Sequence, residues 1–317
     1  MTVKRLDSLV EILRRFNVLL IFIGLCVLLS LLSKNFLSLS NLLNVALQTS
    51  IVAITAIGMT FTMLTAGIDL SVGSLVALSS ALSAGFIMKQ GIPTYPAMAL
   101  ALAVGAGLGA ISGLLIVKGR LPPFVATLAM MAVGRGLTLV YTRGWTIPIM
   151  LDEFTFWGAG TIGLVPVPVV VLAVVFLAAY IVLSRTRFGL HVYAVGGHQE
   201  TARLAGINID LITIIAYVIS GFMAALAGII TAARLYSAQP NVAAGLELDA
   251  IAASVLGGTS LFGGVGSVGG TIVGALIMGV LHNGLNLLEV SSYYQKVVKG
   301  IVFILAVLLD LYTKGRK

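Results

Sequence analysis

Long apolar segments recur along the whole chain, and short polar or glycine-rich stretches separate them. Most segments are about twenty residues long, the length of a helix that crosses a lipid bilayer. Apolar residues are continuous within each segment, whereas the strands of a membrane β-barrel alternate with period two. The pattern therefore predicts about ten transmembrane helices, at residues 16–34, 41–64, 68–88, 93–117, 123–142, 163–184, 211–233, 247–262, 268–288 and 295–313.

The composition agrees with an all-α polytopic membrane protein. Of the 317 residues, 59% are hydrophobic and only 9% are charged, whereas soluble domains carry about 25% charged residues. Because apolar segments recur from end to end, we interpret residues 1–317 as a single transmembrane domain. The net charge of +8 is explained by the basic cytoplasmic loops of membrane proteins, and we expect no nucleic-acid partner.

The distribution of basic residues predicts the orientation in the membrane. Ten crossings would place both termini on the same side. Twelve of the 19 Lys and Arg residues then fall on the terminal side, six fall on the opposite side, and Arg135 lies within a span. Cytoplasmic loops are enriched in Lys and Arg, so both termini are expected in the cytoplasm.

The most polar stretch between two apolar segments covers residues 185–210. A charged side chain at the bilayer centre costs about 2.5–3.5 kcal/mol, so this stretch is expected to be a folded cytoplasmic loop. Residues 199–205 have the pattern of a short amphipathic helix, with Gly196 and Gly197 as start signals and Gly206 as a stop signal. Such a helix suits the cleft of a soluble partner; a solvated loop without a partner is the alternative.

Two glycine-rich stretches, at residues 65–73 and 257–270, interrupt the apolar pattern and predict broken or re-entrant helices. In transporters such breaks lie at the substrate path. A shift of 197 residues pairs Gly67 with Gly264 and Gly73 with Gly270, which indicates an internal repeat. The repeat would be parallel if both segments cross the membrane and inverted if one is re-entrant.

Glycines that are four residues apart predict close helix packing, as at Gly105, Gly109 and Gly113. We expect this packing within the subunit; contact with a second membrane subunit is the alternative.

Motifs for nucleotide, metal or catalytic chemistry are missing from the sequence. No P-loop pattern occurs, so an ATP-driven process would need another polypeptide to hold ATP. The glycines of residues 264–269 match a dinucleotide fingerprint, but they follow a membrane segment rather than a β-strand. Three scattered histidines and one cysteine offer no zinc site. We expect no catalytic residue, no metal and no cofactor.

Four polar residues are the candidates for lining a translocation path: Asp69, Ser71, Asn283 and Asn286. Asp69 lies at membrane depth, where an acidic residue indicates function. It is also placed to cap the following helix by accepting from the N–H groups of Ser71 or Val72. Asn283 and Asn286 share a helix face, and hydrogen bonding between helices is the alternative for both.

Several longer motifs carry a family resemblance. They read LTAGIDLSVG at residues 64–73, GLELDAIAA at 245–253, GGTSL at 257–261, NGLNLL at 283–288 and VSSYYQ at 290–295. Residues 200–206 resemble the Glu-Ala-Ala-x3-Gly coupling loop of bacterial ABC importer permeases, with Thr201 in place of an alanine. Together these motifs resemble the monosaccharide, ribose-type permeases of ABC importers. The chain departs from them at Val265 or Ser267, where a basic residue is expected, and at Glu289, where glycine is usual.

The resemblance implies a ten-helix permease of the bacterial cytoplasmic (inner) membrane that translocates a monosaccharide, with ribose as the first candidate. The implied partners are an ATP-binding subunit with two nucleotide-binding domains, a second permease copy or a paralogue, and a periplasmic or lipid-tethered sugar-binding protein. Residues 185–210 would be the coupling loop to the ATPase. The residues carried over to that role are Arg187, Gly189, Gly196, Gly197, Glu200, Ala202 and Gly206.

Two other classes of protein remain as alternatives at the level of the sequence. An ion-coupled secondary sugar carrier would share the broken helices and would use Asp69 as its coupling site. An intramembrane enzyme is the second alternative, although no nucleophile–base pair or metal set supports it.

Overall fold

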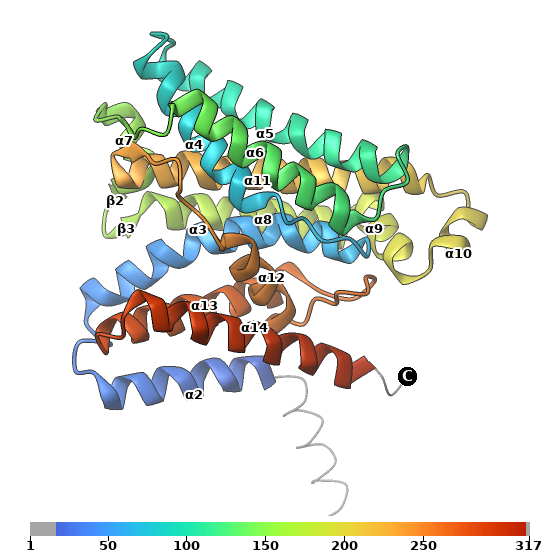
Figure 1. Cartoon of the computed structure of the whole chain (residues 1–317). Coiled ribbons are helices and arrows are strands. Elements are labelled where there is room, and N and C mark those ends of the chain that lie inside the picture. The colour runs from blue at the N-terminus through green and yellow to red at the C-terminus, as the bar shows by residue number, and fades with distance from the viewer. Residues whose placement is uncertain (1–16, 315–317) are drawn as a thin grey trace, which may run out of the picture.

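The computed structural model describes residues 17–314, which form thirteen helices and four two-residue strands (Figure 1). The helices are α2 (Asn17–Leu32), α3 (Leu39–Leu64), α4 (Val72–Met88), α5 (Thr94–Val117), α6 (Pro123–Thr142), α7 (Asp152–Ala159), α8 (Val167–Arg185), α9 (Arg187–Gly197), α10 (Gln199–Leu204), α11 (Ile209–Leu235), α12 (Leu246–Leu256), α13 (Val268–Leu287) and α14 (Ser292–Lys314). The antiparallel strand pairs are β1 (Ile147–Pro148) with β4 (Ser237–Ala238), and β2 (Thr161–Ile162) with β3 (Val165–Pro166). The predicted all-α architecture is confirmed.

All ten expected segments coincide with a helix, but their quality as membrane spans differs. Within residues 17–314, six helices are long and apolar enough to cross a membrane: α3, α5, α6, α8, α11 and α13. Helices α2 and α4 are shorter apolar helices, and α12 has 11 residues. Helix α14 has 23 residues, which include Lys296, Lys299 and Asp310. The number of ten crossings stays a prediction.

Helices α3 and α11 form the interior of the bundle. In the most apolar 18-residue stretch of each of these two helices, 61% of the stretch is buried inside the protein. The corresponding share is 28% in α5, α6 and α8. The peripheral helices expose large apolar side chains such as Leu114, Leu137 and Leu177, which suits a surface surrounded by lipid tails. The largest core cluster joins α3 and α11 to α4, α12 and α13.

The glycines on α5 pack within the subunit, as the sequence predicted. A Cβ atom on Gly105 would lie 2.7 Å from the carbonyl oxygen of Gly221, and one on Gly109 would overlap the carbonyl oxygen of Tyr217. A Cβ atom on Gly113 would lie 2.8 Å from Cα of Ile214. All three partners belong to α11, so small residues allow α5 and α11 to approach at backbone distance.

The two glycine-rich stretches are breaks between helices, as predicted. The first separates α3 from α4, and the second separates α12 from α13. The N–H of Gly264 in the second break donates to the carbonyl of Leu64 at the end of α3 (3.0 Å). Ile51 of α3 and Leu246 of α12 line one cavity, and further along both helices Ser254 donates to the carbonyl of Ala56 (3.2 Å). Because α3 and α12 thus run side by side in the same direction, the two helix–break–helix units have the same direction. If the two units are an internal repeat, the repeat is parallel.

The two ends of the bundle carry different structures. Helices α9 and α10 lie at one end, together with the start of α2 and the end of α14, and α7 and the β2–β3 pair lie at the other end (Figure 1). An ion pair between Lys118 and Asp210 (3.1 Å) joins the loop after α5 to the start of α11 at the α9–α10 end. The basic residues near the termini on which the predicted orientation depends lie outside the described residues: Lys4, Arg5, Arg14, Arg15, Arg316 and Lys317.

We predict that Gly109→Val destabilises the protein and that Gly107→Val does not. A side chain at residue 109 would meet the backbone of α11, whereas nothing lies within 4 Å of a Cβ atom at residue 107. Overpacking a tight contact costs about 1–3 kcal/mol or more. Thermal unfolding of the two variants in detergent would measure the difference. Equal midpoints would contradict the assigned α5–α11 contact, because both variants change helix propensity alike.

Candidate functional site

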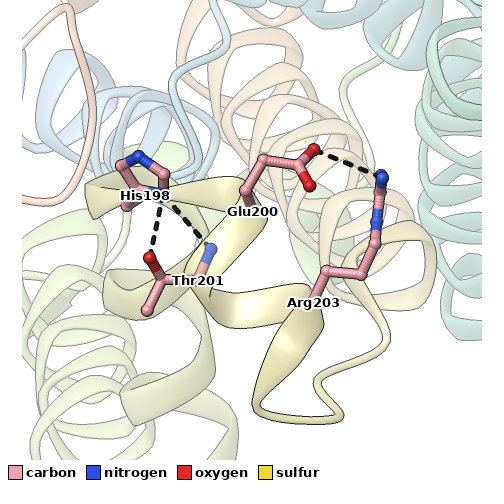
Figure 2. Close-up of polar contacts among 4 residues, drawn as sticks. All are labelled: His198, Glu200, Thr201 and Arg203. Carbon is pink, nitrogen blue, oxygen red and sulfur yellow. Dashed lines mark hydrogen bonds and ion pairs between the residues drawn. The ribbon is translucent and has the colours of Figure 1, made fainter.

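The polar stretch at residues 185–210 forms two successive helices, α9 and α10, of which the sequence predicted only the second. Thr186 caps α9, its hydroxyl oxygen accepting from the N–H of Gly189 (3.2 Å). His198 caps α10, with Nδ1 accepting from the N–H of Thr201 (3.2 Å) and within hydrogen-bond distance of the Thr201 hydroxyl (3.0 Å), as Figure 2 shows. The predicted stop at Gly206 is confirmed by its left-handed backbone, at φ +80°.

The seven residues expected to couple to an ATPase divide into two groups. Gly189, Gly196 and Ala202 are buried against the rest of the chain. Arg187, Gly197, Glu200 and Gly206 are exposed. The first group can hold the segment in place, and the second group is free to meet a partner.

The ion pair of Glu200 contributes little to the stability of the protein. Its carboxylate pairs with Arg203 at 3.3 Å (Figure 2), and both side chains are about two-thirds exposed. An exposed pair of this kind contributes about 0.2–1 kcal/mol to stability at most. A stabilising role for Glu200 is therefore small, and its carboxylate stays accessible.

Two exposed leucines accompany these polar groups. Leu204, the last residue of α10, is 89% exposed, and Leu190 on α9 is 68% exposed. The apolar residues of α10 are Ala202 and Leu204, and of these two only Ala202 is buried. Both leucines are therefore accessible to a partner.

Helix α9 also contacts the end of α3 and the second glycine-rich break, at a point that we call the glycine junction (Leu64, Tyr193, Gly196, Gly264 and Gly266). The Tyr193 hydroxyl donates to the carbonyl of Gly266 (2.9 Å). A Cβ atom on Gly196 would overlap the carbonyl oxygen of Leu64 and would lie 2.5 Å from the nitrogen of Gly264. Three segments that are distant in the sequence thus meet through backbone atoms, which requires glycine at residue 196.

The first pair of candidate path residues forms a buried hydrogen-bond cluster. Asp69 is fully buried; one carboxylate oxygen accepts from the N–H (3.0 Å) and from the hydroxyl of Ser71, and the other accepts from the Ser220 hydroxyl on α11 (2.7 Å). The predicted bond to the N–H of Ser71 is confirmed. The carboxylate therefore ties the break before α4 to α11.

The second pair forms hydrogen bonds between helices. Asn283 exchanges two bonds with Asn41 on α3, at 3.0 and 2.8 Å. The side-chain oxygen of Asn286 accepts from Gln295 on α14 (2.8 Å). The alternative of helix–helix hydrogen bonding is confirmed for both residues. None of the four candidate path residues lines the two cavities described below, and their contact with a solute stays a prediction.

The guanidinium of Arg135 forms its hydrogen bonds with backbone carbonyl groups. It donates to the carbonyls of Pro240 and Val242, both at 3.0 Å. These bonds hold α6 against the loop before α12.

Two adjoining cavities lie where α12, α13 and α14 begin or end. The first cavity, of about 340 Å³, is lined by residues of α3, α11, α12, α13 and α14, among them Gln48, Arg234 and His282. The second cavity, of about 490 Å³, lies between α12, α13 and α14. Asp249 and Lys299 line both. The sequence did not group these residues, because each is a single polar position in a different apolar helix.

The side chains of the described residues do not form a metal site. Across residues 17–314, no group of three or more His, Cys, Asp or Glu side chains is placed to hold a metal ion.

The chain is similar to known proteins over most of its length. The family model described as "Branched-chain amino acid transport system / permease component" matches residues 41–307. The ribose import permease protein of Escherichia coli (strain K12) is 51% identical, with 92% of each chain covered, and that of Bacillus subtilis (strain 168) is 48% identical, with 91% of each covered. The D-allose transport system permease protein of Escherichia coli (strain K12) is 38% identical, covering 89% of this chain and 86% of that protein. No solved structure matches the chain significantly.

We predict that Asp69→Ala lowers the free energy of unfolding by about 1–3 kcal/mol, because it leaves the buried Ser71 N–H and Ser220 hydroxyl without their partner. Ser220→Ala should cost less, since Asp69 keeps its bonds to Ser71. Chemical unfolding in detergent would measure both. An unchanged stability of Asp69→Ala would mean that this carboxylate is not a structural tie.

Proposed function

The chain belongs to the family of branched-chain amino acid transport system / permease components, and on this premise we propose that it is the membrane-spanning permease subunit of an ABC importer for a monosaccharide. The resemblance expected from the sequence motifs is confirmed by relatives that are 44–51% identical over most of the chain. The relatives named are transport permeases, so the chain is a transport subunit and not an enzyme.

Identity to the ribose permeases over nine-tenths of the chain is the observation that carries this proposal. The permeases named for D-allose and xylose are 38% and 34% identical, against 51% and 48% for two of the ribose permeases. We therefore take ribose as the first candidate substrate.

The proposed assembly needs partners that supply energy and affinity. The chain has no P-loop for nucleotide phosphates, so an ATP-binding subunit with two nucleotide-binding domains would hydrolyse ATP. A periplasmic or lipid-tethered sugar-binding protein would deliver the monosaccharide to the opposite side. A second permease copy or a paralogue would complete the transmembrane part.

We propose a multi-pass protein of the bacterial inner membrane, with ten crossings and both termini in the cytoplasm. The α9–α10 end would be the cytoplasmic end. This arrangement is supported by the start of α2 and the end of α14, which lie at the same end as α9 and α10 (Figure 1).

The α9–α10 segment would couple ATP hydrolysis to transport. Its exposed residues Glu200 and Leu204 would contact the ATP-binding subunit, and its buried residues would pass the movement on. The glycine junction supports this role, because α9 touches the backbone at the end of α3 and in the break before α13 there. A movement of α9 therefore reaches α3 and α13 directly.

The alternative of an ion-coupled secondary carrier is not favoured. The relatives named are permeases of import systems, and the proposed coupling residue Asp69 has its hydrogen bonds filled by two serines. Uptake that persists in energised vesicles without an ATP-binding subunit would restore this alternative.

We predict that Leu204→Glu abolishes ATP-driven uptake of D-ribose and that Leu164→Glu does not. Both leucines are largely exposed, at 89% and 72%, but Leu164 lies between β2 and β3 at the opposite end. An unpaired carboxylate in the interface with the ATPase would cost several kcal/mol, so uptake should fall more than about tenfold.

Proteoliposomes that hold the chain, its ATP-binding subunit and the sugar-binding protein would measure uptake. Copurification would report whether the ATP-binding subunit still binds. Normal uptake and normal copurification of Leu204→Glu would contradict the docking role of α10. Wild-type uptake that does not depend on ATP would contradict the proposed function itself.

We predict that Gly196→Ala uncouples the importer while Gly107→Ala on α5 behaves as wild type. A Cβ atom at residue 196 would collide with Leu64, whereas nothing lies within 4 Å of one at residue 107. The expected result is ATP hydrolysis that continues while uptake falls, measured on the same proteoliposomes. Tyr193→Phe removes only the bond to Gly266 and should give a smaller loss. Equal behaviour of the two alanine variants would count against the glycine junction as the coupling route.

A further inference from the structure

Helix α7 lies at the end of the bundle opposite the α9–α10 segment (Figure 1). A Cβ atom on Gly158 of α7 would overlap the backbone nitrogen of Arg234, near the end of α11. Arg234 is 25 residues along α11 from the start of that helix at Ile209, which corresponds to about 37 Å at a rise of 1.5 Å per residue. With the α9–α10 segment proposed at the cytoplasmic end, α7 would lie on the outer side of the membrane.

One face of α7 is fixed against the bundle. Phe154, Thr155 and Gly158 are buried. The chain just before α7 is held as well, because the N–H of Ile149 donates to the carbonyl of Tyr236 after α11 (3.0 Å). These contacts give α7 a fixed position on the end of α11.

The other face of α7 is exposed and acidic. Asp152, Glu153, Phe156 and Ala159 are exposed, and their spacing places them on one side of the helix; we call them the acidic face. Among residues 17–314, neither side-chain carboxylate has a hydrogen-bond or ion-pair partner. Helix α7 contains no Lys or Arg, so its exposed charge is entirely negative.

A lipid surface does not suit the acidic face. Helices that lie on a membrane carry Lys and Arg on their polar side, because anionic lipids attract these residues. The Asp152 and Glu153 carboxylates would be repelled by such lipids. Phe156 lies one turn after them and is 45% exposed, and an aromatic residue bordered by polar groups is typical of a protein interface.

We propose that the acidic face of α7 is a docking surface for the soluble sugar-binding protein, and that it recognises a patch of Lys and Arg residues beside an apolar area of that protein. This assignment rests on the proposed function, because it gives one of the proposed partners a place on the chain. Charges across an interface mainly speed the encounter and select the partner. The two carboxylates would therefore set how much binding protein the importer needs, rather than its maximal rate.

Reversal of the two charges tests the docking surface. The double variant Asp152→Lys/Glu153→Lys is compared with Glu289→Lys, which reverses an exposed carboxylate just after α13. ATP-driven uptake of D-ribose by proteoliposomes is measured against the concentration of the sugar-binding protein. The double variant should need about tenfold more binding protein for half-maximal uptake, with the maximal uptake unchanged. Glu289→Lys should behave as wild type.

Salt dependence gives a readout that a structural role of the carboxylates would not change. In the wild type, the half-maximal concentration of binding protein should rise with sodium chloride, because salt screens exposed charges. In the double variant it should not rise. The thermal unfolding midpoint in detergent should be the same in both proteins, since neither carboxylate has a partner to lose.

A fluorescent label at residue 156 distinguishes a protein partner from the membrane. Cys26 is the chain's single cysteine, so Cys26→Ala provides a background in which Phe156→Cys can be labelled with bimane. The sugar-binding protein should shift the bimane emission, and brominated lipids should not quench it. Quenching by brominated lipids without a response to the binding protein would place α7 on the membrane and overturn the proposal.

The remaining outcomes separate the docking surface from the proposed function. If wild-type uptake requires the binding protein and the double variant keeps the same half-maximal concentration, the docking surface is wrong and the proposed function stands. A double variant that loses maximal uptake at every concentration of binding protein would also overturn the docking surface. Wild-type uptake that is independent of the binding protein would contradict the proposed function itself.

Discussion

Backbone groups that leave a helix beside the hydrocarbon core have to be paired within the protein, because lipid offers no hydrogen bonds. This chain interrupts its helices twice, and it pairs part of the freed backbone between the two breaks. The N–H of Gly264 donates to the carbonyl of Leu64, and the carbonyl of Gly266 accepts from Tyr193 of α9. Gly196 allows α9 to lie directly on this contact. The requirement for hydrogen bonds therefore fastens the polar α9–α10 segment to the ends of the interior helices.

The same helices connect the glycine junction to the first cavity. Along α3, Leu64 at the junction and Gln48 at the cavity are 16 residues apart, which is about 24 Å of helix. Helix α13 starts just after the second break and carries His282, and α12 carries Asp249 and ends at that break. Helices are rigid over such lengths, and a contiguous set of packed elements is the physical form that coupling between distant sites takes.

Polar residues in the spans have two different functions in this arrangement. The Asn41–Asn283 pair and the Asp69–Ser71–Ser220 cluster have partners from other segments and hold helices together. Arg234 and the buried nitrogen of His282 have no such partners among the described residues and face a cavity. The structure thus distinguishes polar groups that hold helices together from polar groups that face a cavity. Both kinds look the same in the sequence, as isolated polar residues in apolar segments.

The sequence by itself determined the all-α architecture, the positions of the ten helical segments and the family. Helical hydrogen bonds are local, so a continuous apolar segment is enough to predict a helix in lipid. Local chemistry also explains why the bond from Asp69 to Ser71 and the helix stop at Gly206 could be predicted. Only the tertiary structure decided that Gly196 touches Leu64, that the two breaks point the same way, and that α10 leaves Leu204 exposed. It also brought Gln48, Arg234 and Lys299 from three different helices to one cavity. These features depend on how helices cross and pack, and such contacts join residues that no local pattern relates.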